Sequence, residues 1–319
     1  MLISVIIPVY NTAKFIKRCV DSVIGQLTDN VELIFIDDSS TDNSLEVLYN
    51  MLSGHNNQNI HVLENKINLG SGETRNKGIA YANGEYVIFI DSDDYVSHNY
   101  FENLIEATAK HPDIIVFDYS EVTNNGIIKK HINAPNTSLK CVEELLLNKM
   151  HNSLCNKLFK KSLFTLQNVN IPKGMSMFED KSICFKLFYY AKTISYIEHN
   201  LYFYDRTRVN SLTNNHRDGD IDASVEVVKT IDDFFKGKVI PESLNKAILA
   251  NKMHVLGFVG LYRTPKEAFK YTDKFGKLPL SAFINEAKVP LHYKLSAFFA
   301  NFRMAFFLYV IRKLYFYCK

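Results

Sequence analysis

Three carboxylates follow one short apolar segment of the chain. Residues 86–91, YVIFID, have the pattern of a buried β-strand, and Asp93 and Asp94 come directly after Asp91. Like charges this close repel one another unless a cation compensates them. Carboxylate oxygens suit Mg²⁺ or Mn²⁺, which keep one or two protein carboxylates and complete their shell with phosphate oxygens and water. The cluster therefore indicates a divalent-metal site, with a solvated turn as the alternative.

Two further pairs of acids occur where an element begins or ends. Asp37 and Asp38 close the apolar segment 31–37, and Glu179 and Asp180 open a segment whose apolar residues recur at helical spacing. Adjacent side chains on a helix point about 100° apart, so the two acids of the second pair cannot share one role. Both pairs have a structural alternative, because acids cap helices, fill turns and are favoured in the first turn by the helix dipole.

The elements around these acids alternate between strands and helices. Nearly continuous apolar runs predict strands at 3–9, 31–37, 60–65, 86–91 and 113–119, and a further strand is expected at 193–204. Helices are expected at about 12–26, 42–53, 73–83 and 98–110. This order predicts an α/β fold with an open, mostly parallel sheet and helices on both faces. Such sheets bind ligands beyond the carboxyl ends of their strands, where the acids lie.

The chain changes character near residue 213. Residues 1–212 hold the alternating elements, with a mostly helical part at 141–191, whereas residues 213–319 look helical with breaks at four prolines, Pro241, Pro265, Pro279 and Pro290. We therefore predict two domains, 1–212 and 213–319. The net charge is only +3, but residues 213–319 carry 17 Lys or Arg against 10 Asp or Glu. This basic region indicates contact with something anionic.

Several classes of protein do not fit these segments. Five scattered cysteines without a Cys-x-x-Cys pair indicate reduced thiols in a cytoplasmic protein rather than disulfides or zinc. No apolar run reaches the ~20 residues of a membrane span. The turn after the first strand, Pro8 to Asn11, lacks the glycines of a dinucleotide site, and residues 68–78 lack the Lys-Ser/Thr ending of a P-loop. A receiver domain would be far shorter and would not explain a second acidic strand end.

Six segments occur in an order that resembles one known family. They are SVIIPVYN (4–11), IDDSSTDNS (36–44), NLGSGETRNKGIAYANGEYVIFIDSDD (68–94), CNKLFKKSLF (155–164), MFEDKSICFKLFYYA (177–191) and LYFYDRTRVNSLT (201–213). The order is similar to that of the family-2 glycosyltransferases, whose catalytic domain has the GT-A fold. The resemblance covers about residues 1–213 and implies a Rossmann-like GT-A domain followed by a helical C-terminal region.

The resemblance also implies roles for individual residues. The family's Asp-x-Asp motif matches Asp91 and Asp93, so Mn²⁺ or Mg²⁺ is expected on Asp93 first and Asp91 second, while Asp94 either assists or caps a helix. Asp180 matches the general base that takes the acceptor proton, and Glu179 is left to support it or to contact the acceptor. The residues expected around the nucleotide sugar are Pro8, Val9, Tyr10, Asn11, Asp38, Asn68, Gly70, Arg75, Asp91, Ser92, Arg206 and Arg208.

Some of these nucleotide-site residues have a specific expected contact. Asp38 would accept the N3–H of uracil. Arg75, with its neighbour Asn76, would reach the diphosphate or ribose, and the alternative for Arg75 is a salt bridge on the helix surface. Arg206 and Arg208 would pair with diphosphate oxygens, because guanidinium groups match phosphate well. Two surface arginines on a loop are the alternative for this pair.

The function that the resemblance implies is metal-dependent, inverting transfer of a hexose or N-acetylhexosamine from a UDP-sugar. The acceptor would be a hydroxyl of a glycan or lipid-linked oligosaccharide, in capsule, exopolysaccharide, lipopolysaccharide or teichoic acid synthesis. A non-catalytic relative that binds sugar nucleotides or glycans in an assembly complex is the alternative. A nucleotidyltransferase would carry a Gly/Arg/Lys-rich loop near the first strand, which is missing here, and no feature indicates a nucleic-acid partner.

The end of the chain predicts a second kind of contact. No acid follows Glu286, and residues 287–319 combine basic residues with many aromatics. Written as one helix, Phe298, Phe302 and Phe306 share an apolar face, with Arg312 roughly opposite. The pattern is typical of a helix that lies in the interface of an anionic membrane, which would place the protein on the inner face of the cell membrane. The alternative is packing on the main domain or on a second subunit in a homo-oligomer.

Overall fold

The structure is a computed structural model that describes residues 1–319 apart from 56–57, 133, 176–177, 208–217, 286–288 and 318–319. The chain divides into two compact units. Unit 1 comprises residues 1–141 and 150–215, and unit 2 comprises residues 142–149 and 216–319. Segment 142–149 thus groups with the C-terminal helices although it lies far from them in sequence.

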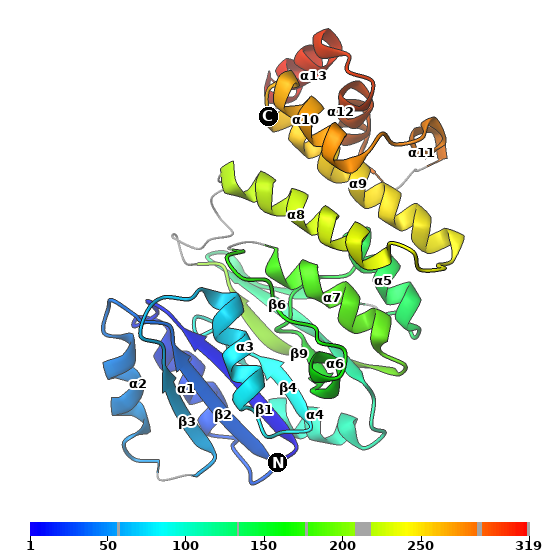
Figure 1. The fold of residues 1–319 in the computed structure, drawn as a ribbon. Coiled ribbons are helices and arrows are strands. Elements are labelled where there is room, and N and C mark those ends of the chain that lie inside the picture. The colour runs from blue at the N-terminus through cyan, green and yellow to red at the C-terminus, as the bar shows by residue number, and fades with distance from the viewer. Residues whose placement is uncertain (56–57, 133, 176–177, 208–217, 286–288, 318–319) are drawn as a thin grey trace. The chain divides into compact units, whose positions relative to one another are not determined.

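One mixed sheet forms the centre of unit 1 (Figure 1). Its strand order is β3 (Ile60–Glu64), β2 (Val31–Asp37), β1 (Ile3–Val9), β4 (Tyr86–Phe89), β8 (Lys157–Lys160), β6 (Ile114–Thr123), β9 (Ile194–Asp205) and β5 (Tyr95–Val96), with β7 (Gly126–Lys130) paired to β6. Strands β3, β2, β1 and β4 are parallel, as predicted. All seven residues of β2 are buried, because both faces of the sheet are covered.

The other half of the sheet differs from the prediction. Strand β8 lies antiparallel between β4 and β6, and β5 pairs antiparallel with β9, while β6 and β9 are parallel to each other. Strand β8 falls in the segment 141–191 that was expected to be mostly helical. Its four residues, KLFK, are too few to show a strand period, and pairing on both sides rather than local propensity makes them extended.

The helices of unit 1 include the four predicted between the strands, and others lie in the segment 141–191 that was expected to be mostly helical. Unit 1 contains α1 (Ile16–Ile24), α2 (Ser44–Leu52), α3 (Ser71–Tyr81), α4 (Tyr100–Thr108), α6 (Ser162–Thr165) and α7 (Glu179–Tyr190), while α5 (Ser138–Leu146) runs from unit 1 into unit 2. Gly78 lets α3 approach the sheet closely, since a Cβ there would lie 2.4 Å from a methyl carbon of Ile6. This close packing sets the first turn of α3 beside the carboxyl ends of β1 and β2.

Unit 2 is helical in the part of the chain that the structure describes. Its helices are α8 (Asp218–Phe235), α9 (Glu242–Tyr262), α10 (Pro265–Phe275), α11 (Leu280–Asn285), α12 (Leu291–Asn301) and α13 (Ala305–Tyr317). The four prolines predicted as breaks each stand at or directly before the first residue of a helix. Among the described residues, no helix has both the length and the apolar character needed to cross a membrane.

Candidate active site

The loops after β1, β2 and β4 meet at one edge of the sheet. Asp38, directly after β2, is only 3% exposed and accepts hydrogen bonds from the backbone N–H groups of Leu69 and Gly70 at 2.9 and 2.8 Å. It also accepts from the Asn65 amide at 2.8 Å. An ionised carboxylate offers about four acceptor positions, so one more N–H can bind. Asp38 therefore holds the loop before α3 and keeps capacity for a ligand.

The turn Asp91–Asp94 separates its acids into different environments. The Asp94 carboxylate is buried, accepts the Asp205 N–H at 2.7 Å and accepts the Tyr202 hydroxyl. Burial, and then the charges of Asp93 and Asp91, raise the pKa of Asp94 well above its usual value. Asp94 therefore ties the turn to β9 and does not cap α4, whose N-cap is Asn99.

The carboxylates of Asp91 and Asp93 are both partly exposed. The backbone carbonyl of Asp93 accepts a hydrogen bond from Arg18 at 3.1 Å, and that guanidinium also pairs with Asp205 and lies 4.4 Å from the centre of the Tyr95 ring. The turn is thus fixed through its backbone, while its half-exposed acids face the strand-end edge.

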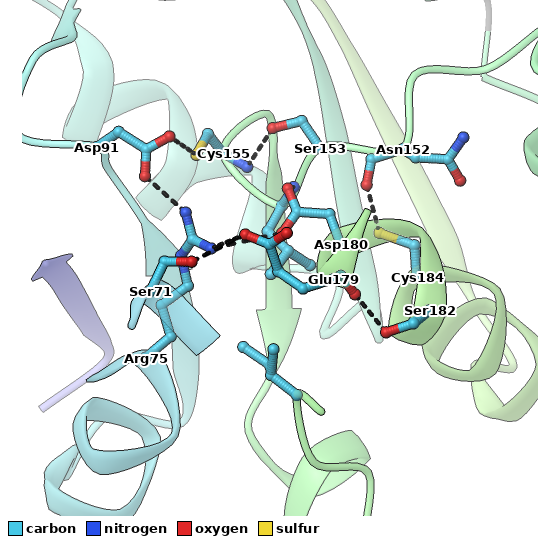
Figure 2. Close-up of polar contacts among 12 residues, drawn as sticks. Ser71, Arg75, Asp91, Asn152, Ser153, Cys155, Glu179, Asp180, Ser182 and Cys184 are labelled. Atoms are coloured by element: carbon cyan, nitrogen blue, oxygen red, sulfur yellow. Dashed lines mark hydrogen bonds and ion pairs between the residues drawn. The ribbon is translucent and has the colours of Figure 1, made fainter. Parts of the chain in front are cut away.

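Arg75 of α3 is the centre of the site (Figure 2). Its side chain is only 6% exposed and pairs with Asp91 at 2.7 Å, Glu179 at 3.2 Å and Asp180 at 3.6 Å. Ser71, one turn earlier on α3, donates to the same Glu179 oxygen at 2.9 Å. One buried guanidinium therefore links the acid at the end of β4 to both acids that open α7.

The Asp180 carboxylate is largely buried and lies near one positive and two negative side chains. Its side chain is 22% exposed, and one oxygen accepts the Leu154 N–H at 3.1 Å. Burial raises the pKa of Asp180 to about 7, Arg75 opposes the rise, and the charges of Glu179 and Asp91 add to it. A carboxylate that exchanges its proton near neutral pH suits a general base.

Lys157 fixes the loop that delivers the Leu154 N–H. Its fully buried ammonium donates to the carbonyls of His151 and Ser153 at 2.8 and 2.6 Å, and to the Asn156 side chain at 2.7 Å. The next residue after Leu154, Cys155, donates its thiol proton to Asp91 at 3.4 Å. This loop therefore contacts both the strand-end acid Asp91, through Cys155 (Figure 2), and the α7 acid Asp180, through Leu154.

The carboxylates of Asp91 and Asp93 fit a metal ion that takes its further ligands from a bound phosphate compound and water. The described residues contain no group of three or more His, Cys, Asp or Glu that could hold a metal ion. Asp91 and Asp93 are both partly exposed, and the two Asp91 oxygens have Arg75 and Cys155 as protein partners. A site with one or two carboxylates suits Mg²⁺ or Mn²⁺ when phosphate oxygens and water complete the shell.

Three predicted nucleotide-site residues have mainly structural contacts. Val9 is fully buried, so its side chain belongs to the core and cannot line a nucleoside. The buried Ser92 hydroxyl accepts from Thr12 at 3.0 Å. The Asn11 side chain accepts the backbone N–H of Thr41 at 2.8 Å, and thereby orders the loop after β2.

Asn76 was expected to reach the diphosphate or ribose, but in the structure its side chain contacts the backbone of another loop. Its amide forms two hydrogen bonds with the backbone of Ile171, at 2.9 and 3.0 Å, and this occupies both ends of the side chain. The Arg75 guanidinium is surrounded by carboxylates, so it forms the salt bridge that was the stated alternative, in a buried place rather than on the helix surface. Guanidinium pairs with carboxylate as well as with phosphate.

The remaining predicted residues keep surfaces that a ligand can reach. Tyr10 and Asn68 are exposed, and Pro8 is half-buried. Gly70 has a φ of +83°, which other residues rarely adopt, and a Cβ added there would meet nothing within 4 Å. Arg206 is exposed and lies 3.6 Å from Glu121, whereas Arg208 lies outside the described residues.

The chain is similar in sequence to known glycosyltransferases. The family model described as Glycosyl transferase family 2 matches residues 4–166. Glycosyltransferase GlyG of Streptococcus pneumoniae is 32% identical over 223 residues, which cover 64% of this chain and 71% of GlyG. The poly(ribitol-phosphate) beta-glucosyltransferase of Bacillus spizizenii is 30% identical over 208 residues, which cover 64% of this chain but only 32% of that protein.

A solved structure gives the fold of the same region. The crystal structure of Staphylococcus aureus TarS 1–349 in complex with UDP-GlcNAc superposes with a TM-score of 0.80 and 19% identity, covering 100% of this chain and 93% of that chain. This similarity confirms the GT-A fold with its helical C-terminal region. The family model, which matches more than half of the chain, shows that the chain belongs to glycosyl transferase family 2.

Proposed function

We propose that the protein transfers a hexose or N-acetylhexosamine from a UDP-sugar to a hydroxyl group of a glycan acceptor, with inversion at the anomeric carbon. The observation that carries this proposal is the Arg75 centre, which holds Asp91 of the Asp-x-Asp turn and Asp180 of α7 around one guanidinium. The acid suited to a diphosphate-bound cation and the acid suited to a proton therefore belong to one site.

Each residue has a separate task in this reaction. Asp93, with Asp91 beside it, would hold Mn²⁺ or Mg²⁺, which supplies compensation of the negative charge that the leaving diphosphate gains. Asp180 takes the acceptor proton, and the Leu154 N–H keeps its carboxylate oriented. One displacement assisted by one base inverts the anomeric configuration, so an α-linked donor gives a β-linked product. The UDP-GlcNAc bound to the TarS structure supports a UDP-sugar donor.

The nucleoside is expected at the edge formed by the loops after β1 and β2. Tyr10 and Pro8 offer exposed apolar surface there, and Asp38 can accept one further N–H, such as that of uracil. The open space beside Gly70 lets a ligand approach the backbone. Arg206 is proposed to approach the diphosphate, and the same proposal extends to Arg208, which lies outside the described residues.

The first test is donor use and metal dependence. In a panel of nucleotide sugars, we expect the protein to release UDP from one or a few UDP-sugars when Mn²⁺ or Mg²⁺ is present. Chelation by EDTA should abolish the release and added Mn²⁺ should restore it. Asp93→Asn should lower the rate by about two to three orders of magnitude at saturating UDP-sugar. Release that ignores EDTA, or preference for GDP-sugars, would contradict the proposal.

The second test is the pH dependence of the rate. The base must be ionised, so kcat/KM should fall about tenfold per pH unit below the Asp180 pKa, which is about 7, and level off above it. The Glu179 charge raises this pKa, so Glu179→Gln should move the inflection to lower pH. A flat profile from about pH 5 to 8, or an inflection that Glu179→Gln leaves in place, would exclude Asp180 as the titrating base.

The acceptor and the cellular location follow as parts of the same proposal. Two kinds of relative act on poly(ribitol-phosphate) by name, a beta-glucosyltransferase and the beta-N-acetylglucosaminyltransferase TarS, and this favours a surface glycan or lipid-linked oligosaccharide as acceptor. The described cysteines are free and buried, which suits a reducing compartment. We therefore place the reaction in the cytoplasm, at the inner face of the cell membrane.

A further inference from the structure

Helix α13 exposes an apolar surface that differs from an ordinary protein surface. Its exposed side chains are almost all large and apolar, and we call them the aromatic face: Phe306, Phe307, Tyr309, Val310, Leu314, Phe316 and Tyr317. At 100° per residue they span about half of the helix circumference, with Lys313 among them. The other half packs on unit 2, where Leu308 is fully buried and Arg312 donates to the Leu261 carbonyl of α9 at 3.0 Å.

This arrangement reverses the usual pattern of a surface helix. A surface helix normally turns charged or polar side chains toward water and buries its apolar stripe. Phe306 is 72% exposed and Leu314 is 58% exposed, so most of their apolar surface stays in water and adds little to the stability of unit 2. Contiguous exposed apolar surface of this kind marks a site for another protein or for a membrane.

The structure changes the expected shape of this segment. The sequence pattern predicted one continuous helix, but α12 ends at Asn301 and Arg303 has a φ of +56°, so the chain turns before α13 begins at Ala305. Asn301, the last residue of α12, is buried and bonds both backbone groups of Leu278. The turn separates α13 from α12, so the aromatic face belongs to α13 alone and does not continue the apolar side of α12.

The part of the sequence that ends in the aromatic face is rich in basic residues. Residues 263–317 contain 10 Lys or Arg and three Asp or Glu. One of the three acids, Asp273, already pairs with Arg303, and Lys313 extends from the aromatic face itself over the Tyr309 ring at 5.6 Å. A partner for this surface therefore needs an apolar region that can bury the aromatic side chains, and negative charge beside it.

An anionic bilayer meets both needs, and a second copy of the chain does not. Two copies related by a two-fold axis would bring the same positively charged surface against itself, which is unfavourable. In a bilayer interface, aromatic side chains reach the acyl boundary while Lys and Arg stay with anionic headgroups. Helix α13 has 13 residues, about 20 Å, which is too short to cross the hydrocarbon core.

We propose that α13 lies in the interface of an anionic membrane, with its aromatic face in the headgroup and acyl boundary and Lys313 among the lipid phosphates. The inference concerns unit 2 alone and does not depend on the reaction proposed for unit 1. It gives the basic C-terminal region a defined binding partner, a bilayer that carries anionic lipid.

The test is sedimentation of the full chain with two kinds of vesicle, phosphatidylcholine alone and phosphatidylcholine mixed with phosphatidylglycerol. We expect the protein to sediment with the mixed vesicles and much less with the neutral ones, and added salt should weaken the binding. Phe306→Ser with Leu314→Ser should lower the partition coefficient by about tenfold or more. Lys313→Glu should lower the preference for phosphatidylglycerol severalfold.

Matched controls come from exposed positions elsewhere in unit 2. Val239→Ser removes a fully exposed apolar side chain, and Lys229→Glu reverses an exposed charge on α8, and neither should change vesicle binding. Wild-type protein that stays in solution with the mixed vesicles, or controls as damaging as the test variants, would overturn the proposal. Light scattering that shows a stable dimer, lost in Phe306→Ser with Leu314→Ser, would assign the face to a second copy instead.

Discussion

Replacing Asp180 by asparagine is expected to lower sugar transfer by about two to four orders of magnitude, the range that a positioned general base contributes. Asparagine has nearly the same shape, and its side-chain oxygen can still accept the Leu154 N–H that Asp180 accepts at 3.1 Å. The amide cannot take a proton from the acceptor hydroxyl. The variant should therefore keep its affinity for the UDP-sugar and lose kcat.

The measurement separates binding from chemistry. Titration calorimetry with UDP-sugar and Mn²⁺ gives the affinity, and single-turnover transfer to an acceptor gives the chemical step. Asp113→Asn is the matched control. Asp113 also accepts backbone N–H groups, those of Lys192 and Thr193, but it directly precedes β6 and, among the residues that the structure describes, forms no hydrogen bond or ion pair with the Arg75 site. Near-normal single-turnover transfer by Asp180→Asn would rule out Asp180 as the base and leave Glu179 to be tested next.

The position of the acids was predictable from the sequence. Continuous apolar runs identified β1, β2 and β4 as buried strands, and parallel strands bring their carboxyl ends to one edge. Asp38 and the Asp91–Asp94 turn therefore had to lie near each other.

The partners of these acids were not predictable. Arg75 meets Glu179 across 104 residues, and Asp94 accepts from Tyr202 across 108 residues. No periodicity or capping rule connects segments so far apart, and the contacts exist only once β8 and β9 have paired with their neighbours. The same holds for Cys155 and Lys157, which lie in the segment that resembles the family's Asn-Lys-Leu motif but whose role depends on the folded loop.

The turn between α12 and α13 shows another limit of sequence analysis. Neither glycine nor proline occurs in residues 302–304, so the sequence contains no signal for a break. Asn301 instead bonds the backbone of Leu278, and this tertiary contact ends α12. Local propensity favoured a continuous helix, and packing within unit 2 overrode it.

Replacing Arg75 by glutamine is expected to destabilise the protein by about 3–5 kcal/mol, the usual cost of leaving buried charges without their partner. The side chain is 6% exposed and compensates Asp91, Glu179 and Asp180. Because Arg75 opposes the rise in the pKa of Asp180, its loss should raise that pKa above about 7. The rate at neutral pH should then fall and recover in part as the pH is raised. Urea unfolding and the pH profile of kcat/KM measure the two effects.

Two further variants distinguish this role from direct binding of the diphosphate. Adding Glu179→Gln to Arg75→Gln removes one of the stranded charges, so the double variant should regain part of the lost stability and move the inflection back toward lower pH. Arg263→Gln removes a largely buried, ion-paired arginine from unit 2 and should leave the pH profile unchanged. If Arg75→Gln instead kept its stability and its pH inflection but lost affinity for UDP, the guanidinium would turn toward the donor during the reaction. The three carboxylates would then only hold it in place until the diphosphate binds.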